Sequence, residues 1–495
     1  MSPPDLTRRD FIIDASTAAI GAMIVPRHVL GGPRHRAPSD TLGIAIIGAG
    51  GMGTENAQQV GSENIVAVCD VDMGLVERKV LERTKDDDGE PRPEGLHWQE
   101  QFGTAAKYTD FRVMLERQTD IDAVIIATPD HLHGVIAKAA MELGKHVYLQ
   151  KPLTWSVYEA RVLRDVARRT GVITQMGNQG HSSDEARRIN EIVQAGVLGE
   201  IREVYVWTNR PIWPQGVPRP GAASPQDPNA PPSWNRGAIT DRTATALAGN
   251  YRPPEGVNWE LFLGPVKDEI TYHPIYHPFN WRGWVEFGVG ALGDMGAHLV
   301  DHPFWALDLG YPTSVEASST PWGGPRDAPV SFPLAMTAAY EFPARGDRPP
   351  VRMYWYDGGL LPPRHEMLPP DVELNPTGGV LYAGERGILL HETYGENPTV
   401  YPESVAESAE QVPESLPRIE EEHEMNWVNA CKGEGEPTAP FDYAAPLTEV
   451  MLLGIVALRA GQGRAIHYDP ESMSITNVPE MDHLLTRDYR PGWEV

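Results

Sequence analysis

The sequence predicts an α/β fold: a doubly wound parallel sheet at the N-terminus, then an α+β domain with a mostly antiparallel, open-faced sheet. Apolar runs at residues 44–47, 65–69 and 121–127 alternate with helix-like segments as far as residue 175. Such runs are typical of strands buried on both faces of a parallel sheet. After residue 312, strand-like runs follow one another without helical crossovers, which favours antiparallel pairing.

The chain length of 495 residues is enough for two or three domains. We expect a targeting segment and linker over residues 1–40, a first domain over 41–175 and a second domain over 176–495. The second domain contains an insertion at about residues 209–285 that is rich in Pro, Gly and Trp. A loop of this length without regular structure is uncommon unless it is functional.

The charge and the cysteine content narrow the possible partners. The formal net charge of −26 disfavours binding to nucleic acid or to an anionic membrane. The two cysteines, Cys69 and Cys431, stand without the Cys/His spacing of a metal site. We therefore expect no nucleic-acid partner, no metal ion and no disulfide.

The N-terminus has the pattern of a targeting segment. Arg8 and Arg9 precede a weakly apolar stretch, residues 11–25, which ends before Pro26. This stretch is too short and too polar to span a bilayer well. Paired arginines before such a stretch resemble a twin-arginine export signal, the alternative being a basic tail. We expect export to the periplasm or cell envelope without a stable membrane anchor.

A glycine cluster follows the first apolar run. Gly48, Gly50 and Gly53 stand at G-x-G-x-x-G spacing, and a helix is expected to begin near Gly51 and Met52. In a Rossmann domain the first glycine allows a tight turn, the second admits a pyrophosphate and the third lets the helix pack closely. The helix N-terminus directs its amide N–H groups at the phosphates. These residues are therefore predicted to bind a dinucleotide.

The second apolar run ends at Asp70. This position is close to the spacing of about 20 residues expected for the carboxylate that binds an adenosine ribose. The alternative is that Asp70 only caps a helix beginning at Asp72. Because a carboxylate repels the 2′-phosphate of NADP and no arginine follows directly, we expect NAD in preference to NADP.

The rest of the first domain continues the alternation. Residues 72–83 carry apolar residues at helical spacing, whereas residues 84–103 are polar and rich in Asp, Gly and Pro, as in a surface loop. The remaining elements expected in this domain are helices at 110–117, 131–143 and 156–170 and strands at 146–149 and 172–175.

The second domain is expected to be helical at its ends and rich in strands between them. Residues 402–422 are acidic and expected to be solvated, and the tail beyond residue 469 is expected to be irregular. The expected elements are helices at 184–195, 422–431 and 446–459 and strands at 201–208, 314–318, 335–342, 351–356, 380–392 and 399–401.

Four features in order resemble the glucose–fructose oxidoreductase / inositol dehydrogenase (Gfo/Idh/MocA) family. They are the glycine loop, Asp70, a Thr-Pro-x-x-x-His pattern at 128–133 and the pair Lys151-Pro152. The family usually has Glu-Lys-Pro, and Gln150 removes a carboxylate beside the lysine. The resemblance runs from about residue 43 to about residue 465. The cofactor contacts that it implies beyond the glycine loop and Asp70 are Thr128, Pro129, His133 and Lys151.

The same resemblance implies a catalytic group. Asp294 and His298 stand four residues apart, so on a helix they share one face. By resemblance, His298 is the general base on a substrate hydroxyl, and Asp294 holds the substrate or tunes the proton relay. Lys151 is then the cation that stabilises the developing alkoxide near the nicotinamide. The alternative is a capping aspartate, a core histidine and a surface lysine.

Several further residues are predicted to contact substrate. The polar loop after residue 176 either lines the pocket or is only a turn. Of the tryptophans in the insertion, we expect most to pin it to the core and one or two to stack on a sugar ring. The predicted substrate contacts are Asn178, His181, His277, Trp281 and Asp301.

The resemblance implies an NAD-dependent oxidoreductase that moves a hydride between nicotinamide and a hydroxyl carbon of a sugar, polyol or glycoside. It also implies a homo-oligomer, because family members use the antiparallel sheet as a subunit interface. Two alternatives remain open. The first is a redox-assisted glycoside lyase or hydrolase with tightly bound, recycled NAD. The second is a non-catalytic sugar or nucleotide sensor.

Overall fold

The computed structural model describes residues 40–221 and 235–495. The predicted export signal therefore lies outside the described residues. The first half of the fold alternates strands and helices. Its elements are β1 (Gly43–Ile47), α2 (Met52–Gln59), β2 (Asn64–Cys69), α3 (Met73–Glu82), α4 (Pro93–Thr104), β3 (Ala106–Tyr108), α5 (Phe111–Arg117), β4 (Ala123–Ile126), α6 (Asp130–Glu142), β5 (His146–Leu149), α7 (Val157–Thr170) and β6 (Thr174–Met176).

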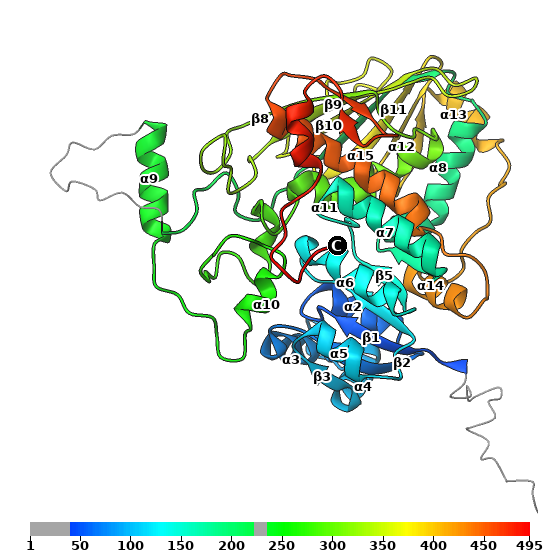
Figure 1. Cartoon of the computed structure of the whole chain (residues 1–495). Helices are drawn as coiled ribbons and strands as arrows, with labels where there is room; N and C mark the ends of the chain where they lie inside the picture. The colour runs from blue at the N-terminus through cyan, green and yellow to red at the C-terminus, as the bar shows by residue number, and fades with distance from the viewer. Residues whose placement is uncertain (1–39, 222–234) are drawn as a thin grey trace, which may run out of the picture.

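These strands form one parallel sheet in the order β3-β2-β1-β4-β5-β6. This is the strand order of a Rossmann domain, in which ligands bind at the carboxyl ends of the central strands. Every residue of β1 and of β4 is buried, because helices cover both faces of the sheet. The domain forms the lower part of the molecule in Figure 1.

The second half contains the larger sheet. Its elements are η2 (Gln179–Ser182), α8 (Asp184–Gln194), β7 (Ile201–Thr208), α9 (Arg236–Leu247), α10 (Trp259–Leu263), η3 (Asn280–Gly283), α11 (Gly290–Leu299), α12 (Asp301–Ala306), β8 (Ser314–Ser319), β9 (Met336–Phe342), β10 (Val351–Tyr356), β11 (Gly378–Gly384), β12 (Ile388–His391), β13 (Thr399–Tyr401), α13 (Glu403–Glu410), α14 (His423–Cys431), α15 (Phe441–Ala460), β14 (Ile466–Asp469), β15 (Ser474–Ile475) and η4 (Pro479–Leu485).

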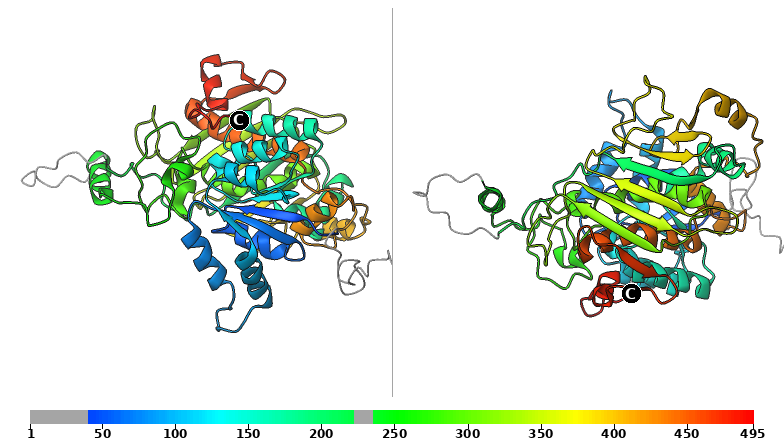
Figure 2. Two further views of the ribbon diagram at one scale, coloured as in Figure 1. Left: turned by 60° about the horizontal axis from the view of Figure 1, so that its bottom comes forward. Right: turned by 90° about the horizontal axis from the view of Figure 1, so that it is seen from above.

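The order of the second sheet is β13-β12-β11-β7-β10-β9-β8-β14-β15. The pairing of β7 with β10 is parallel, and the other described pairs are antiparallel. Its strands lie side by side across the right panel of Figure 2. The predicted fold class, a Rossmann sheet plus a mostly antiparallel sheet, is confirmed.

One element of the first domain was predicted wrongly. The segment expected to be a surface loop, 84–103, contains most of helix α4. Pro93 occupies the first turn, where its missing N–H costs nothing. Trp98 and Phe102 are four residues apart, are both buried and contact each other at 5.8 Å between ring centroids. Tertiary burial of this narrow apolar face outweighs the polar composition that suggested a loop.

Four expectations for the second domain also need correction. The single strand expected at 380–392 is a hairpin, β11 and β12, closed by a hydrogen bond from Gly384 N to Gly387 O (3.0 Å). The acidic stretch 402–422 contains α13, and the tail beyond residue 469 contains β15 and η4. Helix α15 begins at Phe441 and not at Pro446, because the fold accommodates this proline inside the helix.

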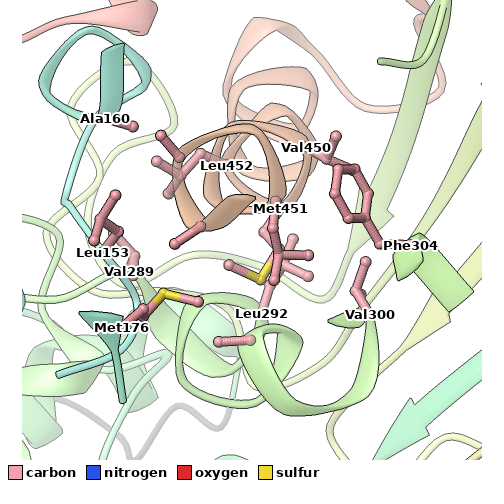
Figure 3. Packing of buried hydrophobic residues seen from close by; sticks show 14 of the residues in the cluster. Leu153, Ala160, Met176, Val289, Leu292, Val300, Phe304, Val450, Met451 and Leu452 are labelled. Carbon is pink, nitrogen blue, oxygen red and sulfur yellow. The ribbon is translucent and has the colours of Figure 1, made fainter. Parts of the chain in front are cut away.

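Helix α15 is the centre of the core. Of the described residues, this helix is long and apolar enough to cross a membrane, but it is mostly buried inside the fold, as in a core helix. Figure 3 shows Val450, Met451 and Leu452 of α15 packed among side chains of α11 and its neighbours. A Cβ atom at Gly296 of α11 would lie 2.7 Å from the sulfur of Met451. This close approach holds α11 against the core.

Two late segments return to the Rossmann domain. Trp427 of α14 packs against Tyr148 of β5, with ring centroids 5.7 Å apart, and Glu424 accepts a hydrogen bond from Asn56 (2.7 Å). Near the C-terminus, Trp493 packs edge-on against Phe111 at 6.0 Å. Two C-terminal segments thus pack against the Rossmann domain.

Candidate active site

A cavity of about 920 Å³ lies between the two domains. One wall is the glycine loop after β1, and the opposite wall includes α11. The carboxyl ends of β1, β2, β4 and β5 all open into it, since the residues directly after these strands line it. This is the edge of a Rossmann sheet where ligands bind.

The glycine loop has the geometry that its spacing predicts. Gly48 has a φ of +84°, and a Cβ atom there would lie 2.7 Å from the backbone of Ala127. A Cβ atom at Gly53 would lie 2.1 Å from the carbonyl oxygen of Gly48. At Gly51, by contrast, no atom lies within 4 Å of the added Cβ. The loop is therefore tight beneath the start of α2 and open on the side that faces the cavity.

The variant Gly53→Ala is expected to destabilise the protein by about 1–3 kcal/mol, the usual cost of overpacking, and to weaken NAD binding. The added methyl group forces the start of α2 away from Gly48, which displaces the amide groups that would face the phosphates. Thermal unfolding and NAD titration measure the two effects. Gly103→Ala is the matched control, because the space around Gly103 is open. Equal stability of the two variants would contradict the assignment.

Asp70 follows β2 and lines the cavity. Its carboxylate oxygens accept hydrogen bonds from the backbone N–H groups of Ala49 and Asp72, both at 2.9 Å. The cap of α3 is Asp72, which accepts from Leu75 N (2.9 Å), so Asp70 is not merely a helix cap. Burial raises the pKa of Asp70 to about 6, although the two backbone hydrogen bonds and His277 oppose this shift.

We expect the Kd for NAD to rise as the pH falls through about 6, the pKa of Asp70. A ribose hydroxyl donates more strongly to a carboxylate than to a carboxylic acid, so NAD binds preferentially to the ionised form. Linkage limits the rise to about tenfold for each pH unit. Calorimetric titrations on both sides of this pH measure it. In Asp70→Asn the binding should be weaker throughout and should lose this pH dependence.

Lys151 lies just beyond the end of β5, at the junction of the two domains. Its Nζ donates to the Oδ1 of Asp294 (2.9 Å) and to the backbone carbonyl of Asp294 (2.7 Å). Nε of Arg282 lies 3.3 Å from the same Oδ1. Burial raises the pKa of Asp294, but Lys151 and Arg282 outweigh burial and hold it at about 2. Asp294 is therefore ionised and fixes both cations.

The contacts of Gln150 and Lys151 explain how this chain can lack the usual glutamate before the lysine. The Gln150 side chain is buried, and its Nε2 donates to Oδ1 of Asn56 (3.0 Å). Among the described residues, Asp294 is the carboxylate that pairs with Lys151. The lysine thus obtains its counterion from α11 and needs none from its own strand.

His298 lies one turn after Asp294 on α11 and lines the same cavity. Its ring packs edge-on against Tyr394, with centroids 4.7 Å apart. Within the described residues its Nδ1 is buried and has no hydrogen-bond partner. Burial, together with the charge of Lys151, lowers the pKa of His298 well below its usual value, against the opposing effect of Asp294. The imidazole is therefore neutral and able to accept a proton.

Only the first part of the Thr-Pro-x-x-x-His stretch lines the cavity. Thr128 and Pro129 line the cavity, and Thr128 Oγ1 is buried without a partner in the described chain. His133 does not line it: its ring nitrogens lie 2.8 Å from Thr128 O and 2.9 Å from Pro152 O. His133 is thus not placed to contact a cofactor in the cavity, in contrast to the expectation. His133 instead holds the loop after β4 close to the loop after β5.

Two of the five predicted substrate contacts line the cavity, and three do not. Trp281 and His277 line the cavity, and Nε2 of His277 lies 2.8 Å from Asp72 Oδ2. Asn178, His181 and Asp301 are buried away from its lining. These three do not line the cavity and they bind one another, although Oδ1 of Asn178 is buried without a partner in the described chain. Asp301 accepts from Asn178 (3.1 Å) and pairs with His181 (3.0 Å), which ties the loop after β6 to α12.

Three lining residues were missed by the sequence analysis. Arg282 follows Trp281, so its position beside a predicted contact was a usable signal. Arg210 follows the end of β7, and Tyr394 lies between β12 and β13. Neither belongs to a motif. Only the folding of the second domain brings Tyr394 against His298 and Arg210 into the same cavity.

The lining residues fit an NAD molecule. The open space at Gly51, the carboxylate of Asp70 and the unpartnered hydroxyl of Thr128 lie along one wall of the cavity. They suit a pyrophosphate, a ribose and a polar group of the cofactor in that order. Over residues 40–221 and 235–495, no group of three or more His, Cys, Asp or Glu side chains is placed to hold a metal ion. Both cysteines are free.

Sequence comparison finds relatives that match part of the chain. A relative named "Glycosyl hydrolase family 109 protein" from Shewanella pealeana is 29% identical over 214 residues, which is 40% of this chain and 44% of the relative. A protein of the same name from Shewanella sp. strain W3-18-1 is 30% identical over 165 residues, 33% of this chain and 34% of the relative. The matches thus span less than half the length of these curated relatives.

Solved structures share the fold over most of the chain. The WlbA dehydrogenase from Bordetella pertussis, in complex with NADH and UDP-GlcNAcA, has a TM-score of 0.52 at 17% identity, covering 87% of this chain and 99% of that one. An NAD-binding protein from Listeria innocua has a TM-score of 0.52 at 16% identity, covering 86% and 97%. Residues 42–178 match the family model GFO_IDH_MocA, described as an oxidoreductase family with an NAD-binding Rossmann fold. Residues 42–178 thus resemble the NAD-binding Rossmann domain of that oxidoreductase family.

Proposed function

We propose that this protein is an NAD-dependent oxidoreductase that transfers a hydride between nicotinamide and a hydroxyl-bearing carbon of a sugar, polyol or glycoside. The observation that carries the proposal is the meeting of Lys151, Asp294 and His298 in the cavity that the glycine loop opens into. Residues from two domains and far apart in sequence converge there, at the place where a nicotinamide would meet a substrate.

The three side chains have complementary roles in this proposal. Bound NAD supplies the hydride acceptor. His298 is neutral and takes the proton of the substrate hydroxyl as the carbon–hydrogen bond breaks. Lys151 stabilises the negative charge that develops on the same oxygen. Asp294 is ionised and, by accepting from Lys151 at 2.9 Å, orients the ammonium group.

Aromatic side chains at the cavity support a carbohydrate as the substrate. Trp213, Phe279 and Trp281 line it, and Phe279 is 45% exposed. The guanidinium of Arg282 stacks on Trp281 at 4.2 Å and on Phe279 at 4.8 Å. The apolar faces of such rings suit the C–H faces of a sugar. Trp259, in contrast, packs in the core of the insertion, which accords with a structural role for most of these tryptophans.

A second function is favoured by the names of the relatives. In a redox-assisted glycoside hydrolase or lyase, the sugar would be oxidised, the glycosidic bond would be broken, and the hydride would then return to the sugar. The relatives called glycosyl hydrolase family 109 proteins support this alternative. The same Lys151 and His298 would serve it, and NAD would remain bound from one turnover to the next.

One experiment separates these functions. The purified protein is analysed for bound nucleotide by mass spectrometry and is then mixed with a panel of sugars and aryl glycosides. A dehydrogenase forms NADH in proportion to the oxidised sugar, measured by absorbance. A hydrolase or lyase releases the aryl group without net NADH. Binding of NAD with neither product across the panel would exclude both functions and would favour a sensor.

Export and assembly are further parts of the proposal. The paired arginines Arg8 and Arg9 support a twin-arginine route, which carries folded proteins and so permits NAD to be loaded before export. The open face of the second sheet supports a homo-oligomer. Cell fractionation of the full chain and light scattering of the purified protein test these two points.

A further inference from the structure

Three cationic side chains of the cavity concern the proposed catalytic group. Lys151, Arg282 and Arg210 all line the cavity. Lys151 and Arg282 share one carboxylate, that of Asp294, at 2.9 and 3.3 Å. Arg210 donates to the neutral amide oxygen of Asn209 (2.8 Å), and within the described chain no carboxylate forms an ion pair with it. The guanidinium of Arg210 therefore lacks a counterion.

A second carboxyl group also lies near the catalytic cations. Asp130 lies at the start of α6, is buried, and accepts a hydrogen bond from Val289 N (3.2 Å). Burial raises its pKa to about 7, although Arg282 and Lys151 oppose this shift. Lys151, Arg210, Arg282, Asp130 and Asp294 line one part of the cavity, the chamber. Of its three cations, Arg210 has no carboxylate partner among the described residues.

Arg210 is held at the chamber by its backbone. Its N–H donates to Thr208 Oγ1 (3.3 Å) and its carbonyl accepts from Gly358 N (2.6 Å). Tyr394, which packs against His298 at 4.7 Å, lines the same chamber. The backbone of Arg210 is thus fixed in the second domain, and the charges of Arg210 and Asp294 both act on Tyr394.

The cofactor does not account for these two arginines. Its pyrophosphate is expected at the glycine loop and the N-terminus of α2, which belong to the first domain. Arg210 and Arg282 come from the second domain. The hydroxyl groups of a neutral sugar are bound by amide and hydroxyl side chains at little electrostatic cost. Arg210 is half-buried, and a partly desolvated guanidinium without a carboxylate partner is stabilised by an anion. A guanidinium fork suits a carboxylate or a phosphate.

We propose that the substrate is a carbohydrate bearing an anionic group, a carboxylate or a phosphate, and that Arg210 is the side chain that binds this group. The inference rests on the proposed function, since it concerns the substrate of the same site. It makes Arg210 a determinant of specificity, with Arg282, which pairs with Asp294, adding positive charge in the same cavity.

The test uses matched sugars and the NAD-loaded enzyme. Glucose, glucuronate and glucose 6-phosphate, with the corresponding galactose and mannose sets, are compared by calorimetric binding and by kcat/KM. We expect an anionic member to bind roughly 10- to 100-fold more tightly than its neutral partner, as for hydrogen bonds to charged groups. The preferred member of each set distinguishes a carboxylate from a phosphate. The preference should weaken as ionic strength rises.

Two variants complete the test. Arg210→Gln should lower the ratio of anionic to neutral binding at least tenfold, by the same estimate. Arg168→Gln removes an exposed arginine of α7 outside the cavity and should leave that ratio unchanged. A panel in which no anionic sugar binds better than its neutral partner overturns the inference. Preferential binding of an anionic sugar without NADH formation or bond cleavage keeps the inference and counts against the proposed function.

Discussion

Replacing Lys151 with Met is expected to lower kcat by about 10³-fold while leaving NAD affinity close to that of the wild type. NAD affinity should change little because Nζ of Lys151 lies at the junction of the domains, 2.9 Å from Asp294. The phosphates of NAD are expected elsewhere, at the glycine loop. The variant removes the charge that stabilises the developing alkoxide. Asp294 keeps a counterion, because Arg282 Nε lies 3.3 Å away, so folding should be preserved.

Steady-state kinetics on the best sugar of the panel and calorimetric NAD titration measure the two quantities separately. Lys138→Met is the control, since Lys138 lies on α6 outside the cavity and pairs only loosely with Glu142 (3.7 Å). Normal turnover in Lys151→Met would rule out the assigned role. A loss of NAD binding comparable to the loss of kcat would instead place Lys151 among the residues that hold the cofactor.

Replacing His298 with Gln is expected to lower kcat by about 10²- to 10⁴-fold, the usual contribution of a general base. Glutamine keeps a polar side chain in the cavity but cannot accept the proton. The groups that face His298 electrostatically are Lys151, Asp294, Asp301 and His302, and burial is the largest influence on its pKa. Because burial and Lys151 together lower this pKa well below its usual value, the base stays active in mildly acidic solution.

The pH profile provides the sharper test of His298. With NAD saturating, so that Asp70 does not contribute, log kcat in the wild type should stay level from neutral pH down through the ordinary titration range of histidine, because the pKa of His298 is lowered well below it. It should fall only below that, as the imidazole becomes protonated. A decline centred near the ordinary histidine pKa of about 6.5 would contradict a buried, neutral base. In His298→Gln the residual activity should lose the acidic limb.

The sequence alone predicted the parts of the site that lie in local motifs. The glycines, Asp70 and Lys151 each follow a buried strand of the first domain, and parallel strands bring their carboxyl ends to one edge. The pair Asp294 and His298 needed only helical spacing to share a face. For these residues, short-range pattern and strand order are sufficient, and the structure places them in one cavity.

The sequence was a poor guide where the environment of a residue is set by other elements of the fold. Asn178, His181 and Asp301 have the residue types of a sugar site, yet they bind each other behind the cavity wall. Helix α4 was mistaken for a loop, because its burial depends on two aromatic side chains, Trp98 and Phe102. In both cases the deciding partner lies on another element, so no local pattern reveals it.

What the sequence by itself determined is the Rossmann domain and its cofactor edge, because buried strands and fixed spacings are local properties of a chain. The roles proposed for Lys151, Asp294 and His298 rest on the resemblance to a family. What only the tertiary structure decided is the surroundings of those side chains: Arg282 pairs with Asp294, Tyr394 packs against His298, and Arg210 lines the same cavity. Charge and burial in a cavity are sums over such distant neighbours, and folding alone sets which neighbours meet.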